Sequence, residues 1–511
     1  MCGFLFLEQD QRDLVSMKAF QRVLDRQKWR GPDALHTSEL KEGRVLVGHQ
    51  RLSILDPVAR SDQPMISRDG RYMIIYNGEI YNHREVRKQL NGPFRTHSDT
   101  ETILEGYAEI GEEIFTLIDG MFALVIYDLL SGDWAAARDP FGIKPLFIYR
   151  GAHCSIVGSE PARVADLAHA SPCEIAIAEW RIIRRPLPGK SFFQGVEEIQ
   201  PGSIVTRSGR VKRYWQLSPS SEPYSQEQFN ALLTQSISWH ELSDVKNVSL
   251  LSGGLDSAII TAISSVSRTY CVGLIDNNEF AGATETASVL GREIINVGVT
   301  SEQLADAWRY LARLRGEPLG LPNEGLIYEV CKQMQADEKV VLTGEGADEL
   351  LFGYDGIFSW ANSSPWLDPI DFLARYGYSN MDPPTERLLD YVESLHNGKN
   401  TLDFVEDFFF DLHLPGLLRR MDFASMAASK EARVPFVSKQ LVQYMYRRPY
   451  HLKIKGQVSK IPIRTIAEGL GLDGALARKK VGFSAQSHAS ANRFTEYKTF
   501  QNLVLGALQW S

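Results

Sequence analysis

The spacing of apolar residues changes near residue 220 of this 511-residue chain, so the two sides of that point follow different fold patterns. Before it, short apolar runs are separated by turn signals such as Asn77-Gly78, and 99–109 is a clear helical stretch. This pattern predicts an α+β domain of stacked, mostly antiparallel sheets with a few helices. A stretch rich in Ser and Pro at 217–227 is predicted to link it to a second domain.

Beyond this linker, apolar β-branched runs alternate with helical segments. The runs lie at 248–251, 270–274 and 340–342. Such alternation is typical of a parallel sheet flanked by helices, so we expect an α/β domain with a mostly helical part after about residue 360. The predicted domains are 1–210 and 211–511.

Composition and charge favour small molecules as the partners of this chain. The net charge of −8, from 55 Lys and Arg against 63 Asp and Glu, argues against binding to nucleic acid. We expect no membrane span, because no run of ~18 apolar residues is present, and no export leader. The cysteines lack the spacing of a zinc site, and their odd number predicts a reduced, cytoplasmic protein. They are Cys2, Cys154, Cys173, Cys271 and Cys331.

Cys2 stands where processing of the chain would change its chemistry. Met1 is normally removed when a small residue follows, which leaves Cys2 with a free α-amino group. The pKa of such an amine is ~7.7–8.0, so about a tenth of it is neutral at pH 7 and can act as base for the thiol. The sequence therefore predicts a nucleophile at the processed chain start.

A series of further motifs accompanies this thiol in order along the chain. They are MCG at 1–3, RGPD at 30–33, RLSI at 51–54, QPM at 63–65, YNGEIYNH at 76–83, SDTE at 98–101, GMFAL at 120–124 and RDPFGIKPL at 138–146. With these motifs the first domain resembles the class II glutamine amidotransferase domain. That resemblance implies the N-terminal nucleophile fold, an αββα sandwich, and glutamine as nitrogen donor.

The same resemblance assigns roles around Cys2. It implies that Arg51 binds the glutamine α-carboxylate and that Glu79 and Asp99 bind its α-ammonium group. Asn77 and the backbone N–H of Gly78 would form the oxyanion hole. The chemistry agrees, because a zwitterion needs a fixed cation and fixed anions, and an acyl-transfer oxyanion needs preorganised donors.

A second motif, SGGLDS at 252–257, follows the apolar run at 248–251 and precedes a helical segment. Backbone N–H groups of such a turn can cradle phosphate, but no Gly-Lys-Ser/Thr follows, so it is not a Walker loop. The motif resembles the pyrophosphate loop of ATP pyrophosphatases, which implies ATP binding. The resemblance covers Ser252, Gly253, Gly254, Asp256 and Ser257.

A third motif, TGEGADEL at 343–350, also follows an apolar run. By the resemblance, Asp256 and Asp348 would hold magnesium against the phosphates, as paired hard oxygen ligands should. Leu250, Val272 and Gly344 would line the adenosine pocket, and Glu345 would lie at the acceptor substrate.

The chain resembles the glutamine-dependent asparagine synthetase family over nearly its whole length. Lys460 aligns with the catalytic lysine of that family, and 431–436 (EARVPF) matches its ExRxPF run. The resemblance implies that one domain releases ammonia from glutamine while the other adenylates a carboxylate with MgATP, most often aspartate. A homodimer is left open.

Three positions depart from the family pattern near its acceptor motif. Phe423 replaces the Arg of DRASMA, Lys430 stands where Leu is usual, and Ser438 replaces the Asp of PFLD. Because loss of an arginine removes a carboxylate binder, a different carboxylic acid stays open as the acceptor. A β-lactam synthetase is disfavoured, since that relative lacks the nucleophilic cysteine and carries Tyr at the position of Glu345.

Overall fold

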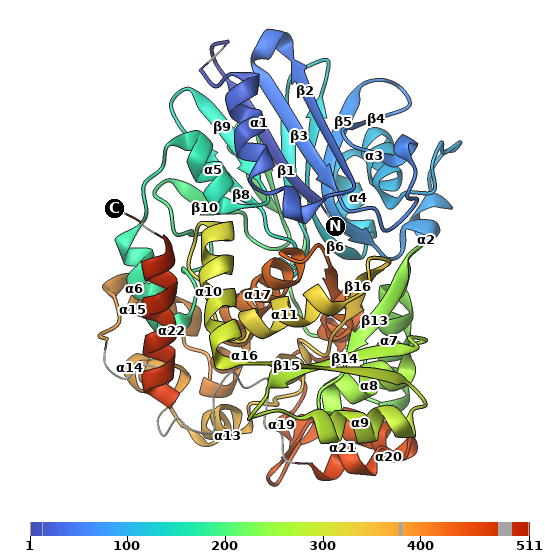
Figure 1. The fold of residues 1–511 in the computed structure, drawn as a ribbon, viewed down its shortest axis with the longest axis vertical. Coiled ribbons are helices and arrows are strands. Elements are labelled where there is room, and N and C mark those ends of the chain that lie inside the picture. Colours follow the sequence, from blue (N-terminus) through green and yellow to red (C-terminus); the bar gives the residue numbers. More distant parts are fainter. Residues whose placement is uncertain (1, 13, 378–381, 479–492, 509, 511) are drawn as a thin grey trace.

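The computed structural model describes the chain except for residues 1, 13, 378–381, 479–492, 509 and 511. Two stacked parts, one rich in antiparallel strands and one with a parallel sheet, meet along a broad boundary (Figure 1). Helix α17 (Leu414–Met426) and strand β16 (Glu338–Leu342) lie at the level where the two parts meet (Figure 1).

The N-terminal part contains two six-stranded antiparallel sheets. The first has the order β10-β8-β9-β1-β3-β2 and the second the order β12-β11-β7-β6-β5-β4. The strands of the first are β1 (Cys2–Gln9), β2 (Ala34–Leu40), β3 (Val45–Arg51), β8 (Phe147–Arg150), β9 (Cys154–Gly158) and β10 (Val196–Glu198). The strands of the second are β4 (Met65–Ile66), β5 (Tyr72–Ile80), β6 (Gly120–Asp128), β7 (Trp134–Arg138), β11 (Ser203–Thr206) and β12 (Val211–Arg213).

Alternation along β1 explains how these sheets form layers. Phe4 and Phe6 pack between the sheets with Ile75 of β5, whereas Leu5 and Leu7 point to the opposite face. That outer face is covered by α1 (Met17–Asp25) and α5 (Pro161–Ala168), and α3 (Asp99–Ile110) covers the outer face of the second sheet. The expected αββα sandwich is confirmed.

The C-terminal part is built on a parallel sheet with the order β15-β14-β13-β16-β17. Its strands are β13 (Lys246–Leu250), β14 (Arg268–Leu274), β15 (Glu293–Val299), β16 and β17 (Glu431–Arg433). The helices interspersed with these strands are α7 (Gln226–His240), α8 (Leu255–Ile263), α9 (Phe280–Val289), α10 (Ser301–Arg315), α11 (Glu324–Gln333) and α12 (Ala347–Leu350). The expected α/β domain is confirmed, although the sequence indicated neither β15 nor β17.

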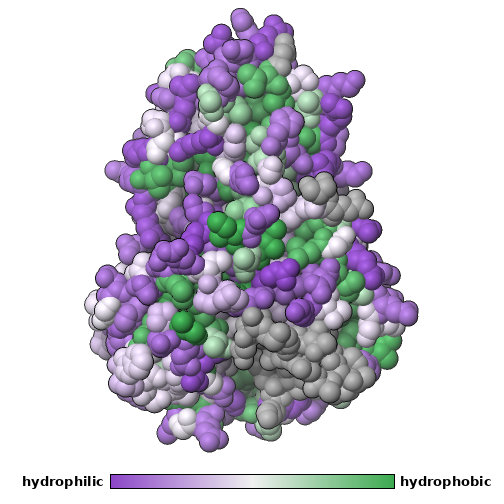
Figure 2. Space-filling model, turned by 90° about the vertical axis from the view of Figure 1, so that its left-hand side faces the viewer, coloured by the Kyte–Doolittle hydropathy of each residue, from purple (hydrophilic) through white to green (hydrophobic). Residues whose placement is uncertain are grey.

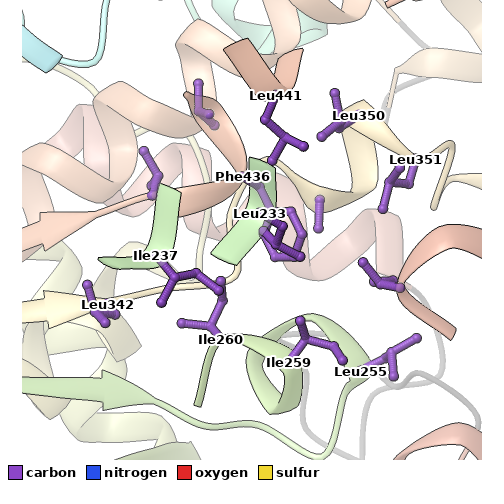
Figure 3. Close-up of a cluster of buried hydrophobic side chains, with 14 of the residues drawn as sticks. Leu233, Ile237, Leu255, Ile259, Ile260, Leu342, Leu350, Leu351, Phe436 and Leu441 are labelled. Atoms are coloured by element: carbon purple, nitrogen blue, oxygen red, sulfur yellow. The ribbon is translucent and has the colours of Figure 1, made fainter. Parts of the chain in front are cut away.

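A hydrophobic cluster fixes the carboxyl ends of two central strands. Leu255 and Ile259 of α8 pack with Leu342 of β16 and with Leu350 of α12 (Figure 3). Because α8 and α12 each follow a parallel strand directly, this cluster holds the two loops that join strand to helix side by side. In open α/β sheets such loops are where ligands bind.

After residue 354 the described chain is mostly helical, as expected. The helices are α13 (Asp355–Ser363), α14 (Pro369–Tyr376), α15 (Glu386–His396), α16 (Thr401–Phe408), α17, α18 (Lys439–Met445), α19 (Tyr450–Lys453), α20 (Ile461–Gly469), α21 (Asp473–Ala477) and α22 (Arg493–Leu508). On the face drawn in Figure 2, hydrophilic residues are interspersed with small hydrophobic groups. Within the described residues, no helix combines the length and apolar character that a membrane span requires.

Candidate active sites

Cys2 is the first residue of β1 and lies between the two sheets of the N-terminal part. Cys2 is only 6% exposed, and this burial raises the pKa of its thiol. Its N–H donates to Oδ1 of Asn77 on β5 at 2.8 Å, and strand pairing places it opposite Arg51 of β3. Burial therefore disfavours the thiolate of Cys2, while the hydrogen bond to Asn77 fixes its backbone nitrogen.

Asn77 and Gly78 lie beside this nitrogen on β5. Nδ2 of Asn77 is buried and has no hydrogen-bond partner among the described residues. Leaving a buried donor without a partner costs free energy, so binding of a group that accepts a hydrogen bond from Nδ2 is favoured. A Cβ on Gly78 would lie 2.1 Å from the carbonyl oxygen of Met121, so only glycine fits this close approach. Asn77 therefore presents a buried donor with hydrogen-bonding capacity for a ligand, and Gly78 follows it directly on β5.

Glu79 and Asp99 differ in how many hydrogen bonds their carboxylate oxygens already accept from the protein. Glu79 is 4% exposed, its Oε2 has no hydrogen-bond partner among the described residues, and burial raises its pKa well above the usual value. By contrast, Oδ2 of Asp99 accepts hydrogen bonds from the Tyr76 hydroxyl at 2.7 Å and the Ile80 N–H at 2.8 Å. Glu79 is thus the carboxylate with capacity for a ligand cation.

Arg51 lies next to Cys2 in the sheet, but its guanidinium is occupied by the segment that follows β3. It donates to the carbonyls of Leu55, Asp56 and Val58 and pairs with Asp62 at 2.7 Å. In this structure Arg51 therefore holds the 55–62 segment. Binding of a glutamine carboxylate would require it to exchange some of these partners.

Two serines of the loop between β13 and α8 form hydrogen bonds within that loop. Oγ of Ser257 accepts from the Ser252 N–H at 3.0 Å, and Oγ of Ser252 accepts from the Gly254 N–H at 3.1 Å. Gly253 lies against Glu279, where an added Cβ would meet its side chain at 3.2 Å. The turn precedes a helix N-terminus, which is the arrangement that favours a bound phosphate.

Lys460 joins the two acidic residues that follow β13 and β16. Its Nζ lies 2.6 Å from each carboxylate oxygen of Asp256 and 2.7 Å from Oδ1 of Asp348. Lys460 precedes α20 and is only 5% exposed, so its side chain does not lie in solvent as a lysine at the start of a surface helix would. A Cβ on Gly353 would lie 1.9 Å from Asp348, so that glycine permits the close packing of this centre.

The donor set at this centre fits magnesium. Two carboxylates converge on one cationic group, and magnesium is commonly held by one or two carboxylates together with phosphate oxygens and water. No group of three or more His, Cys, Asp or Glu side chains suited to a metal occurs within the described part of the chain. Phosphate oxygens and water would therefore have to complete the coordination of an ion held by Asp256 and Asp348.

The residues expected around adenosine lie at neighbouring strand ends. Leu250 ends β13, and Val272 lies near the end of β14 in the same apolar cluster. Gly344 follows β16 so closely that an added Cβ would lie 2.9 Å from the Cβ of Asp256. The structure thus brings the three residues to the sheet edge that carries the phosphate loop.

Glu345 pairs with Arg420 of α17, a cation whose role the sequence did not reveal. Arg420 is 6% exposed, donates to Oδ1 of Asn323 at 3.2 Å, and its Nε has no hydrogen-bond partner in the described chain. The available signal was the Arg419-Arg420 pair within the largely apolar 414–426 stretch. Arg420 and Glu345 form an ion pair between α17 and the loop that follows β16.

Arg478 is a second residue that the sequence did not single out. Its Nε donates to the Gly253 carbonyl at 3.1 Å, and its other nitrogens contact Glu285 at 2.6 Å and Thr286 at 2.5 Å. It therefore links the phosphate loop to α9.

Two of the three departures from the family pattern, Phe423 and Lys430, contact other groups of the protein. Phe423 is fully buried and lies under arginine side chains, and Nζ of Lys430 donates to the Gln335 carbonyl at 2.6 Å. Ser438 is 6% exposed at the start of α18. The contacts of Phe423 and Lys430 explain these two residues by packing and give no reason to exclude aspartate.

Arg433 of β17 contacts both halves of the molecule. Its Nη2 lies 3.7 Å from Oε1 of Glu79, while its carbonyl accepts the N–H of Thr343 at 2.9 Å, two residues before Glu345. Burial alone would raise the pKa of Glu431, but Arg433, 2.6 Å away, lowers it to about 2. One buried residue therefore contacts both Glu79 on β5 and the start of the loop that follows β16.

The comparisons with known proteins agree with this two-site arrangement. Residues 1–215 match the glutamine amidotransferase domain family, and residues 228–505 match the asparagine synthase family. The chain is 28% identical to asparagine synthetase [glutamine-hydrolyzing] 3 of Bacillus subtilis, over 96% of this chain and 88% of that protein. It is also 28% identical to a putative asparagine synthetase of Mycobacterium bovis, over 91% and 83% of the two chains.

Among solved structures, the chain is similar to glutamine phosphoribosylpyrophosphate amidotransferase from B. subtilis. The TM-score is 0.33 at 15% identity, over 58% of this chain and 65% of that one, a level at which the likeness carries no argument.

Fold, sites and family matches together define an amidotransferase ligase that combines a glutamine-using domain with an ATP-using domain. The chain belongs to the asparagine synthase family.

Proposed function

We propose that this protein transfers the amide nitrogen of glutamine to aspartate, at the expense of ATP, through an acyl-adenylate. Residues 1–210 act as the glutaminase and 211–511 as the synthetase. The observation that carries the proposal is Arg433, which contacts Glu79 of the thiol site and, through Thr343, the loop that bears Glu345 and Asp348. A single buried residue at both centres supports transfer of nitrogen within the protein.

At the first site, the Cys2 thiol attacks the side-chain carbonyl of glutamine after its proton passes to the α-amino group. The thioester forms as ammonia leaves, and water then releases glutamate. Nδ2 of Asn77 and the Gly78 N–H stabilise the oxyanion of each tetrahedral intermediate. Glu79 and Asp99 hold the glutamine ammonium, and Arg51 holds its carboxylate after exchanging partners from the 55–62 segment.

At the second site, the acceptor carboxylate attacks the α-phosphorus of ATP and pyrophosphate leaves. Ammonia then attacks the acyl carbon of the mixed anhydride, and AMP leaves. Ser252 to Ser257 cradle phosphate, Lys460 stabilises charge on phosphate or on the tetrahedral intermediate, and Glu345 takes a proton from the attacking nitrogen. Asp256 and Asp348 would hold magnesium, which supplies charge neutralisation on the phosphates when bound.

The acceptor is tested by incubating the purified protein with ATP, magnesium and single carboxylic acids, and by measuring pyrophosphate release. We expect aspartate to give the highest rate, since Glu345 and Arg420 present one anion and one cation to a zwitterionic acid. Higher release with another acid would instead assign the same mechanism to that acceptor. Absence of both pyrophosphate and glutamate formation would contradict the proposal altogether.

A further inference from the structure

Asp422 of α17 lies between two buried cations of the N-terminal domain. Its Oδ2 is 2.7 Å from Nη2 of Arg30, and its Oδ1 is 3.2 Å from Nζ of Lys144. The side chains of Arg30 and Lys144 are fully buried, and that of Asp422 is 2% exposed. The charges therefore face each other across the domain boundary with almost no screening by water.

Arg30 connects this pair to the nucleophile. Its Nε donates to the carbonyl oxygen of Cys2 at 3.1 Å, and its Nη1 is 2.7 Å from Glu160. The planar guanidinium thus makes fixed contacts in three directions, one of them to the backbone of the residue that bears the thiol. Asp422 of the synthetase domain is therefore connected to the backbone of Cys2 through a single side chain, that of Arg30.

Phe423, the next residue of α17, fills the space around this pair. Its ring centroid lies 4.3 Å from Cζ of Arg315, 5.3 Å from that of Arg419 and 5.6 Å from that of Arg30. An aromatic face attracts cations, so the ring accommodates guanidinium groups that would repel an arginine at this position. Glu317 pairs with Arg315 at 2.7 Å and with Arg419 at 2.6 Å.

We propose that Asp422 is a positioning residue for the glutaminase, which fixes Cys2 through Arg30, and that Phe423 maintains the cation cluster in which this pair is held. The consequence is that hydrolysis of glutamine requires a correctly docked α17. The same helix carries Arg420, which pairs with Glu345, so the positioning group and the acceptor end share one rigid element.

Asp422→Asn tests this inference, with Glu406→Gln of α16 as the matched control. Both variants remove one buried carboxylate that pairs with two cations, but Glu406 pairs with Lys453 and Arg447, away from Arg30 and from the cluster around Phe423. We expect Asp422→Asn to lower the kcat of glutamine hydrolysis by about 10- to 100-fold, the cost of a misplaced reacting group. The KM for glutamine should change little, because Asp422 pairs with Arg30 and Lys144 rather than with the residues proposed to hold glutamine.

Ammonia-dependent pyrophosphate release is the readout that separates positioning from general damage. This activity should stay within about twofold of the unmodified protein in Asp422→Asn, and Glu406→Gln should keep its glutaminase kcat. Equal glutaminase rates in the two variants, or a parallel loss of both activities in Asp422→Asn, would overturn the inference. If Asp422→Asn does not fold, Phe423→Leu replaces it: all charges stay, and the glutaminase kcat alone should fall.

The inference rests on the proposed glutaminase function, and the experiment keeps the two apart. If the unmodified protein forms no glutamate from glutamine, the proposed function fails. If it forms glutamate and the Asp422→Asn result matches the control, only the positioning role fails.

Discussion

We expect Cys2→Ala to abolish glutamine-dependent amidation, with a loss of about 10³-fold or more, while ammonia-dependent amidation persists. Cys2 lies beside Asn77, whose Oδ1 accepts its N–H at 2.8 Å and whose Nδ2 has no hydrogen-bond partner among the described residues. The synthetase centre around Lys460 lies on other elements and makes no use of this thiol. The measurement is product formation with glutamine, and separately with ammonium chloride, as nitrogen source.

Cys331→Ala is the control for this substitution. Cys331 is a 1% exposed thiol of α11 in the apolar core, where burial raises its pKa to about 12. The Cys331→Ala variant should keep both activities, because a small apolar side chain at this position removes no reacting group. Loss of ammonia-dependent amidation in Cys2→Ala would contradict the assignment of separate centres.

The converse loss is expected from Asp256→Asn. Pyrophosphate release should fall by about 10²-fold or more, because an amide cannot hold a divalent cation against phosphate as a carboxylate does. It also removes the anion that lies 2.6 Å from Nζ of Lys460, so the ammonium loses one of its two carboxylate partners. Glutamine hydrolysis should survive, and both rates are measured on the same preparation.

Asp306→Asn provides the comparison for this second prediction. Asp306 is an exposed residue of α10 that pairs with Arg309, so its neutralisation changes net charge by the same amount away from the phosphate loop. A fall in pyrophosphate release of equal size in both variants would show that the effect is not specific to the carboxylate at the loop.

The local order of strands and motifs could be predicted from the sequence because both depend on neighbouring residues. Short apolar runs indicated β6 and the first part of β5, and the glycine-rich turn after 248–251 indicated the phosphate loop. The turn expected at Asn77-Gly78 was wrong, because β5 continues through both residues to Ile80 and pairs with β6 along this whole length. β17 could not be predicted, since Glu431–Arg433 carries two charges and has no strand pattern. It becomes a strand only because it pairs with β16, which lies about 90 residues earlier.

The contacts across the domain boundary are also beyond sequence reasoning. Arg30 and Asp422 are 392 positions apart, and nothing in either motif indicates that the two charges meet. The expectation that Phe423 stands at the acceptor arose because a missing arginine suggests a missing carboxylate binder. The structure gives another reason for that residue, since three arginines already surround it.

Isotope transfer tests most directly whether the two sites act together in one reaction. The protein is supplied with glutamine labelled with ¹⁵N in the amide group, ATP, magnesium and aspartate, in the presence of an excess of unlabelled ammonium. The account predicts that the new amide carries the label of glutamine almost undiluted. An amide whose label matches the surrounding ammonium pool would contradict it, because the nitrogen would then have left the protein before it was captured.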